Sequence, residues 1–317
     1  MRYKISIPLL ALALLASVAS VHTIAQNQDE EGVRGSFITS RPATGSASVG
    51  GSVSVGTGGN SGGGAPRRKP RRRPVAAKNT PKNANKNTGG TTVTANANAN
   101  ANVKAYSSAP LGMGYTLYMR DANGEAVRVD PARSFRTGER VRILLETNTD
   151  GYLYIFNTTD NGDPVMIYPD TRIDDGGNYI EAHVPIEVPS SEEADENFRW
   201  FTFDNKPGTE RLYIVFSRDP LPGIPIEDDL VNYCRQKDQN CPWRPSSALW
   251  AQVKAGMNGR VQVVKSKTYG QEQTASERES VNRGLGLTRS APEPSIIRMN
   301  ASSNTGLIIT VLELAHS

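Results

Sequence analysis

Three apolar runs separated by two turn signals lie within residues 140–169, RVRILLETNTDGYLYIFNTTDNGDPVMIYP, and they constrain the fold more than any other part of the chain. In the first run Val141, Ile143 and Leu145 alternate with the residues between them, the period-two pattern of a strand with one buried face. The second run, 152–156, is apolar at every position, as in a strand covered on both sides. The third, 165–168, ends at a proline. Asp-Gly and Asn-Gly pairs between the runs favour tight turns, so the stretch predicts a meander of three strands.

The residues around these turns resemble those of a known family. The pattern consists of Gly138-Glu139 before a strand, Asn148 and 150–154 (DGYLY) at the turn, Tyr168-Pro169-Asp170, and later 210–215 (ERLYIV). It resembles a bacterial domain-of-unknown-function family, DUF 4384, over residues 111–220. The resemblance implies a β-sheet domain of the kind that is exported or attached to other modules, including kinase and peptidase domains. It implies no activity, because none is assigned to that domain.

Further strands and two short helices are expected after this stretch. Residues 180–188 read as a one-sided strand, with Pro185 typical of a sheet edge. Strands are also expected at 198–203, 210–216, 261–267 and 307–314, and helices at 225–237 and 246–255. Acidic residues in the first turn favour the first of these helices. About nine strands with one or two short inserted helices predict an antiparallel β-sandwich, immunoglobulin-like in class, over residues 106–317.

The N-terminal third predicts export and a tether. Arg2 and Lys4 precede an apolar run from 5 to 18, the pattern of a signal peptide ending at Ala25 or Ala19. A membrane anchor is the alternative, although the run is short for a span. Residues 26–105, rich in Gly, Ser, Asn and Pro, are expected to be a disordered linker. The chain is therefore expected to be periplasmic, at the cell surface or secreted.

Charge separates the linker from the sandwich. Residues 26–105 hold twelve Lys or Arg and three Asp or Glu, a net charge of +9, whereas residues 106–317 hold 22 and 29, a net charge of −7. The basic character of the whole chain therefore belongs to the linker, and a nucleic-acid partner is not expected for the folded part.

A compact basic cluster within the linker is a candidate contact for polyanions. Behind a signal peptide its expected partners are anionic envelope polymers or lipid headgroups, and the alternative is a solubilising run without a partner. Membrane contact is expected at most through this cluster, which comprises Arg67, Arg68, Lys69, Arg71, Arg72 and Arg73.

Cys234 and Cys241 are the two cysteines of the chain, and in an exported protein their expected state is a disulfide. Closing this eight-residue loop would add roughly 2.5 kcal/mol by the chain-entropy relation. Two reduced thiols are the alternative. The six intervening residues are not the Cys-x-x-Cys arrangement of a redox-active pair.

Candidate chemistry is weak. His183 is expected to face solvent, and no spacing suggests zinc. Acidic residues in two turns that flank one strand give a weak calcium site, although turn geometry also explains them. No serine-nucleophile motif or dinucleotide fingerprint appears, so no cofactor is expected. The calcium candidates are Asp160, Asp163, Asp170, Asp174 and Asp175.

The strand aromatics are expected in the core, whereas Trp243 and Trp250, in or beside the inserted helices, are candidates for a surface that binds a glycan, a peptide or a partner. Together these features predict an exported, non-catalytic binding or scaffolding module at the bacterial cell envelope. Its partner would be an envelope polymer or another envelope protein. The alternatives are an extracytoplasmic hydrolase that uses the acidic turns, and a polyanion-binding tether with a folded cap.

Overall fold

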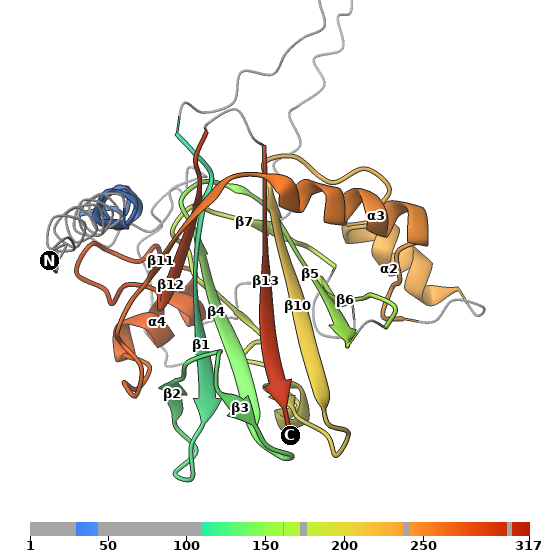
Figure 1. The fold of residues 1–317 in the computed structure, drawn as a ribbon, viewed down its shortest axis with the longest axis horizontal. Coiled ribbons are helices and arrows are strands. Elements are labelled where there is room, and N and C mark those ends of the chain that lie inside the picture. The colour runs from blue at the N-terminus through green and yellow to red at the C-terminus, as the bar shows by residue number, and fades with distance from the viewer. Residues whose placement is uncertain (1–29, 44–108, 161, 172–175, 237–240, 303–305) are drawn as a thin grey trace, which may run out of the picture.

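Two β-sheets pack face to face, with helices on both outer faces (Figure 1). The computed structural model describes residues 30–43, 109–160, 162–171, 176–236, 241–302 and 306–317. Every pairing among the described strands is antiparallel except that of β13 with β3, which is parallel. The β-sandwich predicted from the sequence is therefore confirmed.

The first sheet has seven strands, in the order β11-β12-β1-β4-β8, with β2 beside β1 and β9 beside β4. Its longest strands, β1 and β4, pair from Met113 opposite Thr147 to Met119 opposite Val141. The sequence analysis missed β1 and β12, although β1 lies in the middle of the sheet. The bounds are β1 Gly112–Arg120, β2 Ala126–Arg128, β4 Arg140–Thr147, β8 Ile186–Val188, β9 Phe201–Thr202, β11 Val261–Lys265 and β12 Ile296–Asn300.

The second sheet has six strands, in the order β3-β13-β10-β5-β6, with β7 beside β5. The C-terminal strand β13 pairs with β10 along ten residues, so the chain returns to the sheet at its end, as predicted. The bounds are β3 Ser134–Phe135, β5 Gly151–Thr159, β6 Val165–Tyr168, β7 Tyr179–Ile180, β10 Gly208–Ser217 and β13 Leu307–His316.

The main core lies between the sheets and follows the period-two pattern. Val141, Ile143 and Leu145 of β4 face Leu153 and Ile155 of β5 within one cluster of buried side chains. The other face of the second sheet is also buried, because Tyr152, Tyr154 and Phe156 contact the inserted helices. The apolar run 152–156 is thus covered on both sides, as predicted.

The inserted helices are α2 (Glu227–Arg235) and α3 (Ser247–Ala255), close to their expected bounds, with the short 3-10 helices η1 (Glu196–Phe198) and η2 (Gly256–Asn258). Figure 1 shows α2 and α3 beside β5, β6 and β10. A third helix, α4 (Ala275–Arg283), was not predicted, and it begins with a capping box between Thr274 and Glu277.

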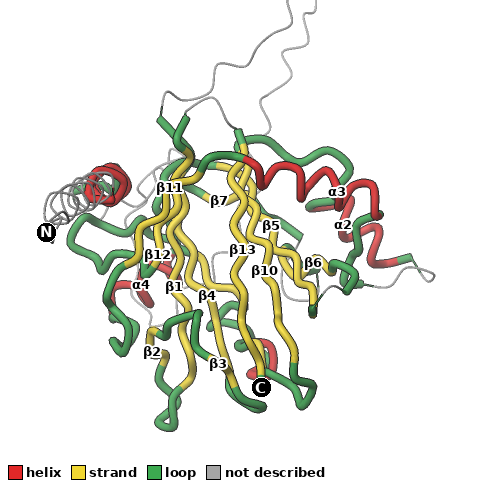
Figure 2. The backbone as a smooth tube through the Cα atoms, viewed as in Figure 1, coloured by secondary structure: helices red, strands yellow, loops and turns green. Residues whose placement is uncertain are grey.

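Both faces of β4 are buried, whereas its sequence pattern predicted that only the inner face would be. Arg142 is 5% exposed and Glu146 is 2% exposed. The chain that covers them comprises α4, the loop after it and residues 30–43, drawn as helix and loop in Figure 2. Alternation along a strand identifies the two faces but does not show what lies on them, because the covering segments are far away in sequence.

The predicted meander is wrong. β4 belongs to the first sheet and β5 to the second, so the chain crosses between sheets at Asp150-Gly151 instead of forming a hairpin. Only β5 and β6 form the expected hairpin pair. Asn161 lies outside the described residues, and among the described residues of that turn Asp160 has a positive φ, at 52°.

The single strand predicted at 180–188 is also wrong. β7 pairs with β5 in the second sheet, β8 pairs with β4 in the first, and the chain turns between them at His183, where φ is 59°. The chain crosses between the sheets from β7 to β8. In the sequence, the apolar alternation before and after this crossing looks the same as that of one continuous strand.

The expectation of disorder from residue 26 is wrong for residues 30–43. Residues 30–39 form a helix against the first sheet, with Phe37 fully buried. Phe37 packs in a small cluster with Val33, Ile297 and Met299. Residues 1–25, predicted to be a signal peptide, and residues 44–105 lie outside the described part. Within the described part, no helix is long and apolar enough to cross a membrane.

Candidate functional site

At one end of the main core, the inward-facing positions change from apolar to polar. Along β5, Leu153 and Ile155 are followed on the same face by Asn157 and Thr159. Neighbouring strands show the same change, since Glu210 precedes Leu212 in β10 and His316 follows Leu314 in β13. Because alternate residues of a strand share a face, these polar groups line the same end of the sandwich.

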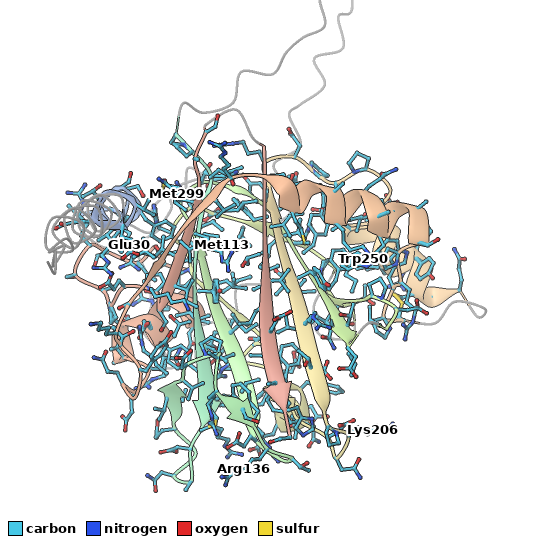
Figure 3. The ribbon with its side chains drawn as sticks, viewed as in Figure 1. Glu30, Met113, Arg136, Lys206, Trp250 and Met299 are labelled. Atoms are coloured by element: carbon cyan, nitrogen blue, oxygen red, sulfur yellow. A yellow bond between two sulfur atoms is a disulfide. The ribbon has the colours of Figure 1, made fainter. Side chains whose placement is uncertain are left out.

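A pocket of about 310 Å³ opens there between the two sheets. It lies at the end where Figure 1 places the C-terminus, and Figure 3 shows the labelled Arg136 and Lys206 at the same end. Half of its lining residues are apolar and half are polar, so an apolar wall lies beside several hydrogen-bonding groups. The lining residues are Val141, Asn157, Thr159, Ile167, Phe201, Thr202, Phe203, Asp204, Glu210, Leu212, Leu314 and His316.

Glu210 is the central acceptor of the pocket. Asn157 Nδ2 donates to Glu210 Oε2 at 2.9 Å, and Thr159 Oγ1 donates to the same oxygen at 3.1 Å. The other end of the amide, Asn157 Oδ1, is buried and accepts no hydrogen bond from the described residues. A buried acceptor without a donor is costly, so this atom favours a ligand that carries one.

His316 and Asp204 complete the polar lining. His316 is 6% exposed, its Nε2 lies 3.4 Å from Thr137 Oγ1, and its ring packs on Phe203 with centroids 5.2 Å apart. Asp204 Oδ1 accepts from the backbone N–H of Lys206 at 2.8 Å and lies near the surface. The arrangement offers two carboxylates and an amide oxygen to a donor, beside an apolar wall.

The three calcium candidates that the structure describes, Asp160, Asp163 and Asp170, do not form a metal site. Asp160 and Asp170 lie at opposite ends of β6, and Asp160 Oδ1 accepts from the backbone N–H of Thr209 at 2.9 Å. Asp163 is exposed in the turn, whereas Asp174 and Asp175 lie outside the described residues. No group of three His, Cys, Asp or Glu able to hold a metal occurs in the part of the chain that the structure describes.

His183 does not face solvent. It is 4% exposed, and its Nδ1 lies 2.7 Å from Glu146 Oε1, a distance at which the ring N–H donates to the carboxylate. The residue sits on the outer face of the first sheet, on the other side of that sheet from the pocket. The expectation that His183 faces solvent is therefore wrong, and the residue does not line the pocket.

The tryptophans expected at the surface are buried. Trp243 is 9% exposed and Trp250 is 7% exposed. Trp250 packs against Tyr213 and Phe156, at centroid distances of 4.8 and 5.4 Å, and Figure 3 shows it between the helices and the second sheet. Their aromatic surface holds the helices to the sheet, so the expectation of an exposed aromatic patch is wrong.

The cysteine prediction is confirmed. Cys234, in the last turn of α2, forms a disulfide with Cys241, with Cα atoms 5.6 Å apart. No free cysteine occurs among the described residues. The basic cluster of residues 67–73 lies outside the described part of the chain.

The family model of a domain of unknown function (DUF4384) matches residues 134–220. The resemblance found in the sequence is thereby confirmed over that range, which begins at 134 and not at 111. Ten of the twelve pocket-lining residues lie inside the matched segment, and Leu314 and His316 lie outside it. No curated protein and no solved structure matches the chain.

The sequence analysis missed every polar residue of the pocket. One signal was present, since Asn157 and Thr159 continue the inward-facing positions of an apolar strand. Glu210 and His316 become their neighbours only through the pairing of β5 with β10 and of β10 with β13. That pairing spans more than 150 residues, and no local pattern encodes it.

Proposed function

We propose that this chain is a non-catalytic binding module exported to the cell envelope, and that the pocket at the end of the main core is its ligand site. The observation that carries the proposal is Glu210, a carboxylate that lies in a half-apolar pocket beside the unpartnered oxygen of Asn157. A group with an apolar body and an ammonium or other hydrogen-bond donor at its tip matches this lining. Such groups occur in peptides and in envelope polymers.

The pocket belongs mainly to the family-matched segment, which supports a role shared by that kind of domain. The rim is mixed in charge, because Asp204 lines the pocket and Figure 3 shows Arg136 and Lys206 at the same end of the molecule. We therefore assign the donor group of the ligand to the interior beside Glu210, and any anionic group to the rim.

Export is supported by the signal-like residues 1–25 and by the disulfide, which is consistent with an extracytoplasmic location. A catalytic role gains nothing from the acidic turns, since Asp160 and Asp170 are held apart by β6. The described cysteines are joined in the disulfide and offer no thiol nucleophile.

Small probes test the pocket directly. Butylammonium, butanol and butyrate share an apolar body and differ in the group at the tip. We expect butylammonium to shift the methyl NMR signals of Ile167, Leu212 and Leu314 in a saturable way, and butyrate to bind at least about tenfold more weakly, a difference of about 1.4 kcal/mol. Glu210→Gln should remove most of the preference for the ammonium.

Glu313→Gln is the matched control, because Glu313 is an exposed carboxylate on the neighbouring strand that pairs with Arg211 at 2.9 Å. It should leave the binding of butylammonium unchanged. Equal binding of all three probes, or tighter binding of butyrate, would refute the assignment of the donor group to Glu210.

The envelope location has its own test, which also separates the pocket from the tether. Residues 26–317 should co-sediment with isolated envelope and cell-wall fractions, and deletion of 65–78 should leave that binding intact if the sandwich carries it. Loss of binding on this deletion would favour the alternative, a polyanion-binding tether with a folded cap. Absence of binding by both proteins would refute the envelope role.

A further inference from the structure

The strand register arranges the polar groups of the pocket in layers. In the deepest layer Asn157 lies opposite Leu212. In the next layer Glu210 lies opposite Leu314, and His316 follows Leu314 at the end of β13, nearer the mouth. Because alternate residues of a strand share a face, a ligand that enters the pocket meets His316 first, then Glu210, and then Asn157.

The lining of the pocket carries negative charge. Of its twelve residues, Asp204 and Glu210 are carboxylates, and none is a lysine or an arginine. Neither carboxylate forms an ion pair with any residue that the structure describes. A cleft lined by charge of one sign attracts ions of the opposite sign, so these residues favour a cationic ligand.

Glu210 presents one oxygen to a ligand. Its Oε2 already accepts hydrogen bonds from Asn157 Nδ2 at 2.9 Å and from Thr159 Oγ1 at 3.1 Å, whereas Oε1 accepts none from the described residues. A guanidinium fork binds both oxygens of a carboxylate, whereas an ammonium is a compact charge that needs only one. The unpartnered Asn157 Oδ1 supplies a second acceptor. The interior therefore selects an ammonium over a guanidinium.

An apolar wall lies beside these acceptors, and a methylene stem of the ligand can lie along it, as the stems of long charged side chains do on apolar surfaces. The volume of about 310 Å³ is at the lower end of the range for small-molecule sites, about 300–1,000 Å³. The pocket therefore suits a ligand of the size of an amino acid. The wall comprises Val141, Ile167, Phe201, Phe203, Leu212 and Leu314.

Two turns border the mouth of the pocket, and each carries a cation. The turn that holds Arg136 is fixed to the lining, because the backbone N–H of Gly138 donates to the carbonyl of Phe203 at 2.8 Å. The turn that holds Lys206 begins with the lining residue Asp204. Both cations are exposed, and Figure 3 shows them at this end of the molecule. The rim therefore offers one carboxylate and two cations, which complement the α-ammonium and the α-carboxylate of an amino acid.

We infer that the pocket binds a free amino acid whose side chain ends in an ammonium, with lysine, whose side chain is a butylammonium group, as the probe of this class. The inference rests on the proposed ligand site and names the class of its ligand. The side-chain ammonium bonds to Glu210 Oε1 and Asn157 Oδ1, and the methylene stem lies along the apolar wall. The α-ammonium pairs with Asp204, and the α-carboxylate pairs with Arg136 and Lys206.

Lysine derivatives test the recognition of the head group and distinguish the free amino acid from a lysine in a peptide. In NMR titrations of residues 26–317, lysine should bind about tenfold more tightly than butylammonium, because each exposed ion pair at the rim contributes about threefold. Nα-acetyllysine lacks the α-ammonium and lysinamide lacks the α-carboxylate, so each should bind about threefold more weakly than lysine. Nα-acetyllysinamide, which represents a lysine within a peptide, should bind as butylammonium does.

Arginine tests the selection made by Glu210, because it has the same head group as lysine and a guanidinium at its tip. It should bind at least about tenfold more weakly than lysine. Glu210→Gln should weaken the binding of lysine by at least about tenfold as well, because the ammonium loses its carboxylate.

Asp204→Asn tests the rim separately from the interior. It should weaken the binding of lysine by about threefold and abolish the difference between lysine and Nα-acetyllysine, because the α-ammonium loses its carboxylate partner. Glu313→Gln is the matched control, since Glu313 is an exposed carboxylate of β13 that does not line the pocket. It should leave every affinity unchanged, and circular dichroism confirms that the variants are folded.

The outcomes separate this inference from the proposed ligand site. If butylammonium binds and lysine binds no more tightly, or if arginine binds as tightly as lysine, the inference is overturned and the ligand site stands. Tighter binding of Nα-acetyllysinamide than of lysine overturns the assignment of the head group to the rim. If none of these compounds binds, the proposed ligand site fails together with the inference.

Discussion

Buried charges are the unusual feature of this protein at the residue scale. Besides Arg41 and Glu146, the outer face of the first sheet holds Arg128 with Glu277 at 2.6 Å, and Arg142 with Glu187 at 3.5 Å. The guanidinium of Arg142 also lies 4.0 Å from the centre of the Trp200 ring. Burial lowers the pKa of Arg142, and Glu187 opposes that change. Such pairs add little net stability, but loss of one partner leaves a charge buried alone.

Gly151 offers a sharp test at the same scale, because the chain crosses between the sheets there. A Cβ at this position would meet the carbonyl oxygen of Ser217 and come within 2.7 Å of the Phe216 ring. We expect Gly151→Ala to lower the free energy of unfolding by about 1–3 kcal/mol, measured by urea denaturation.

Gly259→Ala is its control. Nothing lies within 4 Å of a Cβ at Gly259, and its φ of −66° suits alanine. It should be neutral or raise stability by about 0.4–1 kcal/mol. Equal effects of the two substitutions would contradict the packing at the crossing.

Tyr179 gives a prediction on alkaline titration. Burial first, and then the carboxylate of Asp150 at 3.2 Å, raise its pKa from 10.0 to about 12. Since the pKa is raised in the folded state, the contribution of this residue to stability is present below pH 10 and is lost as the pH rises toward 12.

In Asp150→Asn the pKa of Tyr179 should fall but stay above 10, because burial is the larger cause. Ring carbon NMR between about pH 9 and 11.5, near the ordinary tyrosine range, follows the change, with the signal assigned by Tyr179→Phe. Titration of wild-type Tyr179 at its ordinary value would refute the prediction.

At the element scale, α4 joins a helix start to a buried ion pair. Thr274 Oγ1 accepts from the backbone N–H of Glu277, and Glu277 Oε2 accepts from the backbone N–H of Thr274 at 2.9 Å. The other oxygen, Oε1, accepts from Arg128 Nη2 at 2.6 Å and from the Tyr118 hydroxyl at 3.0 Å. One side chain therefore starts the helix and fixes it to β1 and β2.

The two halves of this capping box should differ in cost. Thr274→Ala loses a cap and should cost about 1 kcal/mol, whereas Glu277→Ala also leaves Arg128 buried without its carboxylate and should cost about 3–5 kcal/mol. Urea denaturation of both variants measures the difference. Similar values for the two would mean that Glu277 acts only as a cap.

The segment 30–39 is a second element whose structure depends on its surroundings. Ten residues are too few for a stable isolated helix in water, so its conformation comes from the contacts of Phe37 and from Arg41 just after it. Its composition and position in a polar tail gave no sign of this docking.

At the scale of the whole molecule, the family-matched segment is an incomplete sandwich. Residues 134–220 contain β3 to β10 but lack β1, the long neighbour of β4, and β13, which pairs with β10 along ten residues. They also lack β12, which pairs with β1 in the first sheet. The helices α2, α3 and α4, which cover the outer faces of the two sheets, lie outside the segment as well.

We therefore expect residues 134–220 alone to remain unfolded, because their unpaired strands and uncovered apolar faces would be exposed to water. Residues 109–317 should fold cooperatively. The dispersion of amide signals in a nitrogen–proton NMR spectrum distinguishes the two, and a well-dispersed spectrum for 134–220 would contradict the expectation.

The sequence by itself determined the features that depend on nearby residues. Alternating apolar residues predicted which face of β4 points into the core, and the continuous apolar run predicted that β5 is covered on both sides. Acidic residues in the first turn predicted α2. Two cysteines in a chain expected to be exported predicted the disulfide. In each case the controlling residues lie within a few positions of one another, so the pattern is visible along the chain.

Only the tertiary structure decided which sheet each strand joins and what covers its faces. The crossings at Gly151 and His183, the burial of Trp243 and Trp250, and the pairing of Arg41 with Glu146 depend on segments that are distant in sequence. The pocket has the same origin, since Asn157, Glu210 and His316 meet only when three strands align. The physical reason is that strand pairing and helix docking are long-range contacts, and the local chain does not encode their partners.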